Sequence, residues 1–90
     1  MLKIIRSNKF IKDLRLAKSR GFDLEALNVV VTKLANQEQL EPKYRDHALV
    51  GKFIGLRECH IKPNWLLIYS IDDDELELFL FRSGTHSDLF

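Results

Sequence analysis

The spacing of apolar residues changes once along this chain, near Pro42, and that change constrains the fold more than any other feature. Before it, apolar residues recur every three or four positions, the period of an amphipathic helix. After it, they form short runs rich in β-branched and aromatic side chains, which favour strands. A helical half followed by a strand-rich half predicts an α+β fold.

The first half predicts one strand and two helices. Residues 2–6 are short and apolar, and a Ser-Asn pair then suits the start of a helix over residues 9–20. Gly21 is placed to end that helix, and Asp23 can cap a second one. A β-branched run weakens the propensity of the second helix, but its wider spacing remains helical. The two helices should form an antiparallel hairpin.

The second half predicts a four-strand antiparallel meander with turns rich in Gly, Pro, Asn and Asp. The expected strands cover residues 48–50, 54–61, 65–71 and 75–81. Residues 85–90 are too few for more than a loop or one helical turn. We therefore expect the N-terminal strand and the helical hairpin to pack on one face of a small antiparallel sheet, with the other face free.

Length and composition limit the class of protein. With 90 residues, 46% of them hydrophobic, residues 1–90 should form a single domain around one core. Its apolar runs are too short to cross a membrane, and the N-terminus has no export signal, so we expect a soluble cytoplasmic protein. Cys59 is the only cysteine, which excludes an internal disulfide, and we expect it to be a buried strand residue.

The net charge of +1 hides an uneven distribution of acidic side chains. Residues 72–77 contain five of the 13 acidic residues, so the rest of the chain carries 14 basic and eight acidic side chains. This asymmetry is compatible with a face that attracts a polyanion while the acidic turn points elsewhere.

Three histidines are the residues best suited to chemistry, namely His47, His60 and His86. Their spacing does not suit a metal site, and we expect neither a metal nor a cofactor. Histidine can both accept and donate protons near neutral pH, as RNA cleavage by 2′-hydroxyl attack requires. Arg82 is a candidate cation for a phosphate. The residue types alone leave a purely structural role open.

Two aromatic residues, Trp65 and Phe90, could stack on RNA bases. Each also has a structural alternative. Trp65 opens an apolar strand and could belong to the core, and the terminal Phe90 could dock into the core instead of facing a cleft.

Three motifs follow one another at residues 46–51, 60–69 and 82–90. They match D-H-x-L-x-G, H-x-x-P-D-W-x-L-x-Y with one departure, and R-x-G-T-H-x-x-L-F. Together they resemble the YafQ family of RelE-type toxins, and three motifs in order are far more specific than one. The resemblance implies the RelE-like microbial ribonuclease fold.

The resemblance also implies a function and a set of site residues. It implies a toxin that cleaves messenger RNA in the decoding site of the ribosome, and that is inhibited by a cognate antitoxin of ribbon-helix-helix type. DNA would be bound only through the antitoxin complex. Matched position by position, the resemblance assigns catalysis to His47, His60 and His86, and substrate binding to Asn64, Trp65, Arg82 and Phe90.

Asn64 stands where the family has aspartate. An amide cannot take up a proton as a carboxylate does, so it cannot be a general base. Either the histidines suffice for cleavage, or the chain is a catalytically weakened or inactive member. Such a member would bind RNA, the ribosome or mainly its antitoxin.

Overall fold

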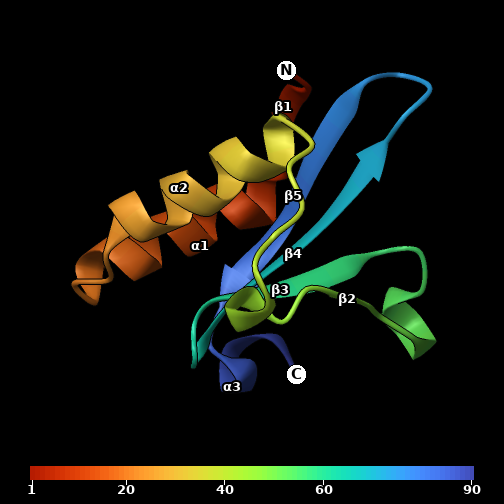
Figure 1. Ribbon diagram of the computed structural model, residues 1–90. Coiled ribbons are helices and arrows are strands. Elements are labelled where there is room, and N and C mark those ends of the chain that lie inside the picture. The colour runs from red at the N-terminus through yellow and green to blue at the C-terminus, as the bar shows by residue number, and fades with distance from the viewer.

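The computed structural model describes residues 1–90, which form a helical layer and a sheet (Figure 1). In chain order, the elements are β1 (Lys3–Arg6), α1 (Asn8–Ser19), α2 (Leu24–Ala35), the 3-10 helix η1 (Pro42–Tyr44), β2 (His47–Ala48), the 3-10 helix η2 (Gly51–Phe53), β3 (Arg57–Lys62), β4 (Trp65–Asp72), β5 (Glu77–Gly84) and α3 (His86–Leu89). The α+β class expected from the sequence is confirmed.

The sheet has five strands in the order β1-β5-β4-β3-β2. Strands β2 to β5 pair antiparallel as a meander, as predicted. Strand β1 pairs parallel with β5, with Ile4 opposite Leu78, so the sheet is mixed and not wholly antiparallel. A parallel neighbour needs a long connection, and here α1, α2 and the meander provide it.

Several strand boundaries differ from the prediction, the largest shifts being where the backbone turns although the sequence pattern continues. Strand β2 ends at Ala48 and β3 begins at Arg57, since Gly51 and Gly55 adopt left-handed φ values of 69° and 92° around η2. Leu76 is also left-handed, with φ 56°, and β5 begins only after it and continues to Gly84.

Both helices begin at the side chains that suit capping. The Ser7 hydroxyl accepts a hydrogen bond from the Phe10 amide at 2.9 Å and donates to the Phe81 carbonyl at 2.6 Å, which ties the start of α1 to β5. The Asp23 carboxylate accepts from two amides at the start of α2. Gly21, with φ 77°, lies in the turn between the helices, as predicted.

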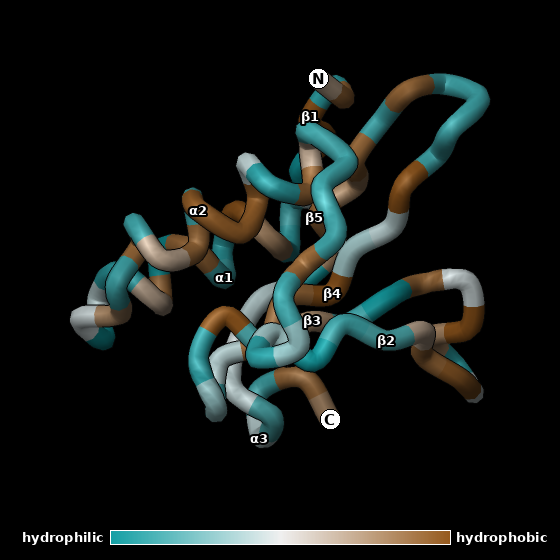
Figure 2. Tube along the Cα trace, in the orientation of Figure 1, coloured by the Kyte–Doolittle hydropathy of each residue, from teal (hydrophilic) through white to brown (hydrophobic).

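The main core lies between the helical hairpin and one face of the sheet, where apolar stretches of both layers face each other (Figure 2). Phe10, Val30 and Leu67 are among its fully buried side chains. Cys59 is also part of this core and is 0% exposed, as predicted. None of the helices has the length and apolar composition that a membrane crossing requires.

The opposite face of the sheet is called the second face here. It was expected to be free, but it carries a smaller cluster of Leu66, Ile68 and Leu89. Leu89 belongs to α3, so the last residues of the chain fold back over this face. Leu49, Leu56 and Phe81 pack around the cluster. The prediction failed here because the return of the C-terminal residues over this face leaves no local pattern in the sequence.

Candidate active site on the second face

The strand register places His47, Glu58 and His60 on the second face. Directly opposed residues of antiparallel strands point to the same side of a sheet. Glu58 is opposite both His47 and Ile68, and His60 is opposite Leu66. Because Leu66 and Ile68 form the cluster of the second face, the two histidines and Glu58 share that face.

The Glu58 carboxylate lies between the two imidazoles. Its Oε1 is 3.8 Å from Nε2 of His47 and 3.4 Å from Nε2 of His60. Glu58 is only 5% exposed, and its side chain makes no hydrogen bond. Its two ion-pair partners are these imidazoles. A buried carboxylate needs a charged or hydrogen-bonding partner, and the two imidazoles are the groups placed to provide one.

The other ring nitrogen of each histidine is held by a backbone carbonyl. Nδ1 of His47 donates to the Arg45 carbonyl at 2.7 Å, and Nδ1 of His60 donates to the Pro63 carbonyl at 3.3 Å. Since a carbonyl oxygen can only accept, Nδ1 carries the hydrogen in both rings. Each Nε2 then faces the Glu58 carboxylate. A carboxylate can only accept a hydrogen bond, so Nε2 must carry a proton to make one with Glu58.

The segment that carries His47 has a strained backbone and is held by a partly exposed hydrogen-bond network. Arg45 adopts a left-handed φ of 51°, which is costly for a residue with a side chain. The next residue, Asp46, accepts hydrogen bonds from Tyr69 at 2.5 Å and from Arg57 at 3.2 Å. Burial, with the Asp46 bond as second cause, raises the pKa of Tyr69. This network keeps the His47 ring against Glu58.

Helix α3 is fixed at its start by Asp88. The Asp88 carboxylate accepts from the Thr85 amide at 2.9 Å, while the Thr85 hydroxyl accepts from the Asp88 amide, which completes a capping box. Arg20, at the end of α1, donates to the same carboxylate at 2.7 Å. The Arg20 hydrogen bond, followed by the Thr85 amide, holds the pKa of Asp88 well below its usual range.

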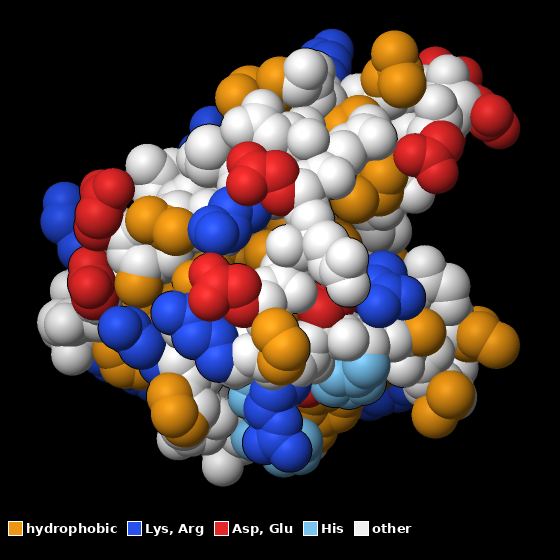
Figure 3. Space-filling model, in the orientation of Figure 1, with side chains coloured by type: hydrophobic (Ala, Val, Ile, Leu, Met, Phe, Trp, Pro, Cys, Tyr) orange, Lys and Arg blue, Asp and Glu red, His pale blue; other side chains and the backbone are white.

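The capping box holds His86 and Phe90 over the second face. Their rings stack with centroids 4.9 Å apart, and Phe90 meets Phe53 edge to face at 5.4 Å. Gly84, two residues before His86, is opposite Leu66, which is also opposite His60. The third histidine therefore lies on the same side of the sheet as the first two. Figure 3 shows the histidine side chains gathered at one end of the molecule.

Phe90 and Arg82 are placed to meet a substrate in different ways. Phe90 is 50% exposed, so its ring is open to a base. Arg82 is partly exposed but already donates from Nε and Nη2 to the Asp13 carboxylate, at 2.8 and 3.1 Å. A phosphate would meet the remaining Nη1 group. The Asp13 hydrogen bond also raises the pKa of the Arg82 guanidinium.

Trp65 is not available to stack on RNA. It is 3% exposed, packs edge to face against Phe22 at 5.1 Å in the main core, and donates from its indole nitrogen to the Ser83 hydroxyl at 3.0 Å. Its assignment to substrate binding is therefore corrected in favour of the core alternative. The reason is that Trp65 starts β4 on the face covered by the helical hairpin.

Asn64 lies in the exposed turn between β3 and β4, and its side chain makes no hydrogen bond. With Lys62 and Thr85, it borders a shallow hollow of about 250 Å³. The structure thus separates Asn64 from the contacts made by Glu58.

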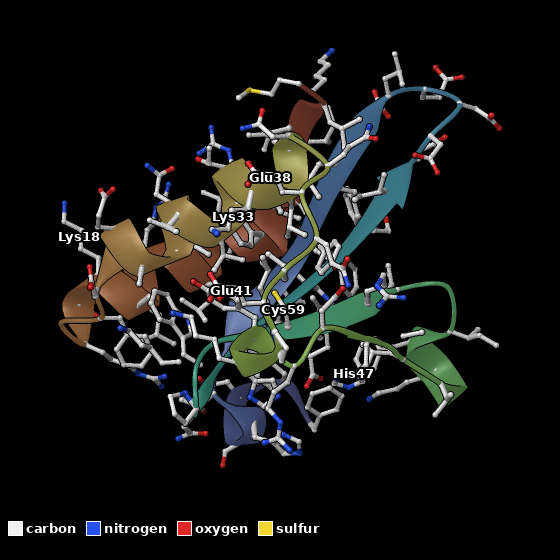
Figure 4. All side chains as sticks on the ribbon, viewed as in Figure 1. Lys18, Lys33, Glu38, Glu41, His47 and Cys59 are labelled. Carbon is white, nitrogen blue, oxygen red and sulfur yellow. The ribbon has the colours of Figure 1, made fainter.

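Glu58 is the functional candidate that sequence reasoning missed. Alternation along a strand places Glu58 and His60 on the same face, and that signal was present in the sequence. Its neighbour Cys59 points to the opposite side, into the main core, and burial raises the pKa of its thiol to about 12. Figure 4 shows Cys59 within the sheet and His47 on β2.

Comparisons with known proteins agree in both sequence and fold. The family described as bacterial toxin of type II toxin-antitoxin system, YafQ, matches residues 2–90. The mRNA interferase toxin YafQ of Escherichia coli K12 is 39% identical over 85 residues, which are 93% of this chain and 90% of that protein.

Two kinds of solved structure extend this similarity. A metal-bound toxin from Helicobacter pylori is 51% identical, with a TM-score of 0.94 and full coverage of both chains. The YafQ chain of the E. coli DinJ-YafQ complex is 37% identical, with a TM-score of 0.89, and is covered over 99% of its length by the whole of this chain.

Proposed function

Because this chain belongs to the YafQ family of bacterial type II toxin–antitoxin toxins, we propose that it is an endoribonuclease that cleaves messenger RNA in the decoding site of the ribosome. The name of the E. coli relative, an mRNA interferase, supports the reaction. The observation that carries the proposal is the arrangement of three histidines on one sheet face, two of them around the buried Glu58.

The reaction needs a proton acceptor, a proton donor and a cation. The acceptor removes the proton from the 2′-hydroxyl, whose oxygen attacks the adjacent phosphorus, and the donor protonates the departing 5′-oxygen. This route gives a 2′,3′-cyclic phosphate and a free 5′-hydroxyl. Protein side chains supply every proton transfer in this scheme, and RNA supplies the nucleophile.

We assign the donor to the pair of histidines around Glu58. Both Nδ1 atoms are held by carbonyls, and both Nε2 atoms face the carboxylate, so Glu58 and the two carbonyls fix the orientation of both rings. His86 is exposed and makes no side-chain hydrogen bond, so its ring can accept the 2′-hydroxyl proton. Its stacking on Phe90 fixes the plane of the ring.

Arg82 and Phe90 would position the substrate. The Arg82 guanidinium is held by Asp13, which limits its motion and leaves one amino group for a phosphate oxygen. The exposed Phe90 ring offers a stacking surface for a base next to the cleaved bond.

A metal ion is named in the description of the H. pylori relative, so we tested whether the side chains here fit one. No group of three or more His, Cys, Asp and Glu side chains is arranged to hold a metal ion. No step of the proposed reaction uses a metal ion.

We also propose that a cognate antitoxin inhibits the protein, since the E. coli relative was solved in complex with DinJ. The antitoxin would be of ribbon-helix-helix type, and DNA would be bound only through the complex. Ribosomes and messenger RNA place the activity in the cytoplasm.

A second candidate is a weakened or inactive member that only binds RNA, the ribosome or the antitoxin. Asn64 favours it, because the family has a carboxylate at that position. In the structure, however, the Asn64 side chain makes no hydrogen bond to Glu58 or to either imidazole, which favours the active enzyme.

A change of leaving group tests the proposed reaction. Programmed ribosomes are given a message with sulfur in place of the 5′-oxygen at the cleaved bond, because a thiolate departs without needing a proton. His60→Ala should cut the normal message about 10²- to 10⁴-fold more slowly and regain most of its rate on the sulfur-containing one. His86→Ala should stay slow on both. If neither message yields a cyclic phosphate with the unaltered chain, the proposed reaction is wrong.

A further inference from the structure

A second hollow adjoins the candidate active site on its other side, between η1, α2 and the end of β3. It has a volume of about 520 Å³ and shares one wall, the His60 ring, with the active site. We call it the basic pocket, and it is lined by Ala26, Val29, Lys43, Tyr44, Arg45, His60, Ile61, Lys62 and Pro63.

The charge of the basic pocket is of one sign. Lys43, Arg45 and Lys62 line it, and none of its lining residues is acidic. No carboxylate lies within salt-bridge distance of any of the three cations, since none of them takes part in an ion pair. Three unpaired cations around one hollow attract an anion.

Glu58 lies 3.4 Å from His60 but is only 5% exposed, and the acidic residues that flank the pocket residues in sequence, Glu41 and Asp46, are occupied elsewhere. Glu41, just before η1, faces Lys33 on α2 at 3.5 Å (Figure 4). Asp46, just after Arg45, accepts hydrogen bonds from Arg57 and Tyr69. Neither carboxylate neutralises the pocket, and Figure 3 shows Lys and Arg side chains bordering the histidines.

The backbone couples the basic pocket to the active site. Arg45 contributes its side chain to the pocket, while its carbonyl accepts from Nδ1 of His47. The left-handed conformation of Arg45 lets one residue serve both sides, and such strain persists where the surroundings enforce it. Lys43 is also held in place, with its ammonium 5.1 Å from the centre of the Tyr44 ring.

We infer that the basic pocket binds a phosphodiester of single-stranded RNA next to the one that is cleaved, an inference that rests on the proposed function. An RNA strand whose cleaved phosphate lies at His60 and His86 would continue past His60. The basic pocket is the cationic hollow on that side of His60. The pocket would therefore set the register of the strand, because a phosphate fixed beside His60 determines which bond reaches the histidines.

The test measures binding without cleavage. A fluorescent 2′-O-methyl oligoribonucleotide keeps every phosphate but cannot be cleaved by 2′-hydroxyl attack, and its affinity is followed by anisotropy over a series of salt concentrations. Each phosphate contact on a single strand contributes about 0.7 to the slope of log affinity against log salt. Because the pocket holds one phosphate, Lys43→Gln with Lys62→Gln should reduce the slope by about 0.7.

Matched variants separate the pocket from general charge. Lys9→Gln with Lys12→Gln removes the same charge from the exposed side of α1 and should leave the slope unchanged. Lys43→Arg with Lys62→Arg keeps the charge and should also keep the slope. Equal losses in both glutamine pairs, no loss in either, or no salt-dependent binding by the unaltered chain would overturn the inference.

A second measurement distinguishes this inference from the proposed function. Two messages each carry one uncharged methylphosphonate, on one side or the other of the cleaved bond, and the unaltered chain should cut both more slowly than the normal message. The Lys43→Gln, Lys62→Gln double variant should not be slowed further by the methylphosphonate at the pocket position. If the salt dependence of binding changes as expected but no message is cut, the pocket inference holds and the enzymatic proposal fails. If cleavage occurs but the slope does not depend on these lysines, the pocket inference fails alone.

Discussion

The Oε1 atom of Glu58 lies 3.4 Å from Nε2 of His60, in a site where Glu58 is almost excluded from solvent. His47 approaches the same oxygen from the neighbouring strand. One buried carboxylate therefore orients two imidazoles and stabilises the positive charge of either.

Glu58→Gln should reduce messenger RNA cleavage by roughly 10- to 100-fold while the fold is retained. The amide keeps the size of the side chain but removes the charge that holds the imidazolium. Single-turnover cleavage on programmed ribosomes measures the loss. Glu75→Gln, an exposed change in the turn between β4 and β5, is the control and should act like the unaltered chain. Full activity of Glu58→Gln would contradict the role given to the carboxylate.

Asp88→Asn should destabilise the protein by about 1 kcal/mol at neutral pH, because it removes a cap and weakens the Arg20 contact. The lowered pKa of Asp88 means that the folded state gains stability from the ionised carboxylate. That gain is fully present above the ordinary carboxyl pKa of about 4 and is lost as the pH falls below it. Urea unfolding of both chains across this range should show the difference shrinking with acidification, and a constant difference would refute this.

Trp65→Phe should lower stability but not cleavage, as expected for a core residue. Phe90→Leu should impair cleavage but not stability, as expected for a residue that contacts substrate. Trp65→Phe loses the bond to Ser83 and should lower stability by about 1 to 2 kcal/mol, with normal cleavage per folded molecule. Phe90→Leu removes an exposed ring and should weaken substrate use with little effect on stability. Thermal unfolding and saturation kinetics on both variants give the comparison. A cleavage defect in well-folded Trp65→Phe would return Trp65 to the substrate site.

The Cys59 thiol should not react with a disulfide reagent in the native protein. It is fully buried, and burial raises its pKa to about 12, so neither access nor thiolate is present at neutral pH. In urea above the unfolding midpoint, one thiol per chain should react. Rapid reaction without denaturant would show that β3 is not in the register described here.

Asn64→Asp should change cleavage by less than about tenfold if the histidines and Glu58 are sufficient. The two imidazoles are held by Glu58 and by the Arg45 and Pro63 carbonyls, and the Asn64 side chain makes no hydrogen bond to this group. Cleavage rates of the two chains on the same message decide the matter. A gain of several hundredfold would instead identify the chain as a weakened member of the family.

The sequence predicted the helical hairpin and the meander well because both depend on local periodicity. Ser7 and Asp23 cap their helices, and the second-half strands pair in chain order. It did not predict that β1 joins β5 in parallel, because that contact links the two ends of the chain and leaves no local pattern.

The candidate site was predicted in part for the same reason. His47, His60 and His86 came from residue type and resemblance, and the structure places all three on the second face. Which of the flanking residues shares that face depends on strand register. Glu58 was therefore missed, and the substrate role that the resemblance gave to Trp65 was wrong because its side chain lies in the core.

Mapping of messenger RNA ends in a translation extract tests the central claim most directly. The purified chain is added to the extract, and the ends are located by primer extension, with His86→Ala as the matched variant. The account predicts new ends that appear only when the message is being translated and that are lost with His86→Ala. An unchanged message with the unaltered chain, or the same ends with His86→Ala, would contradict the claim that these histidines cleave RNA.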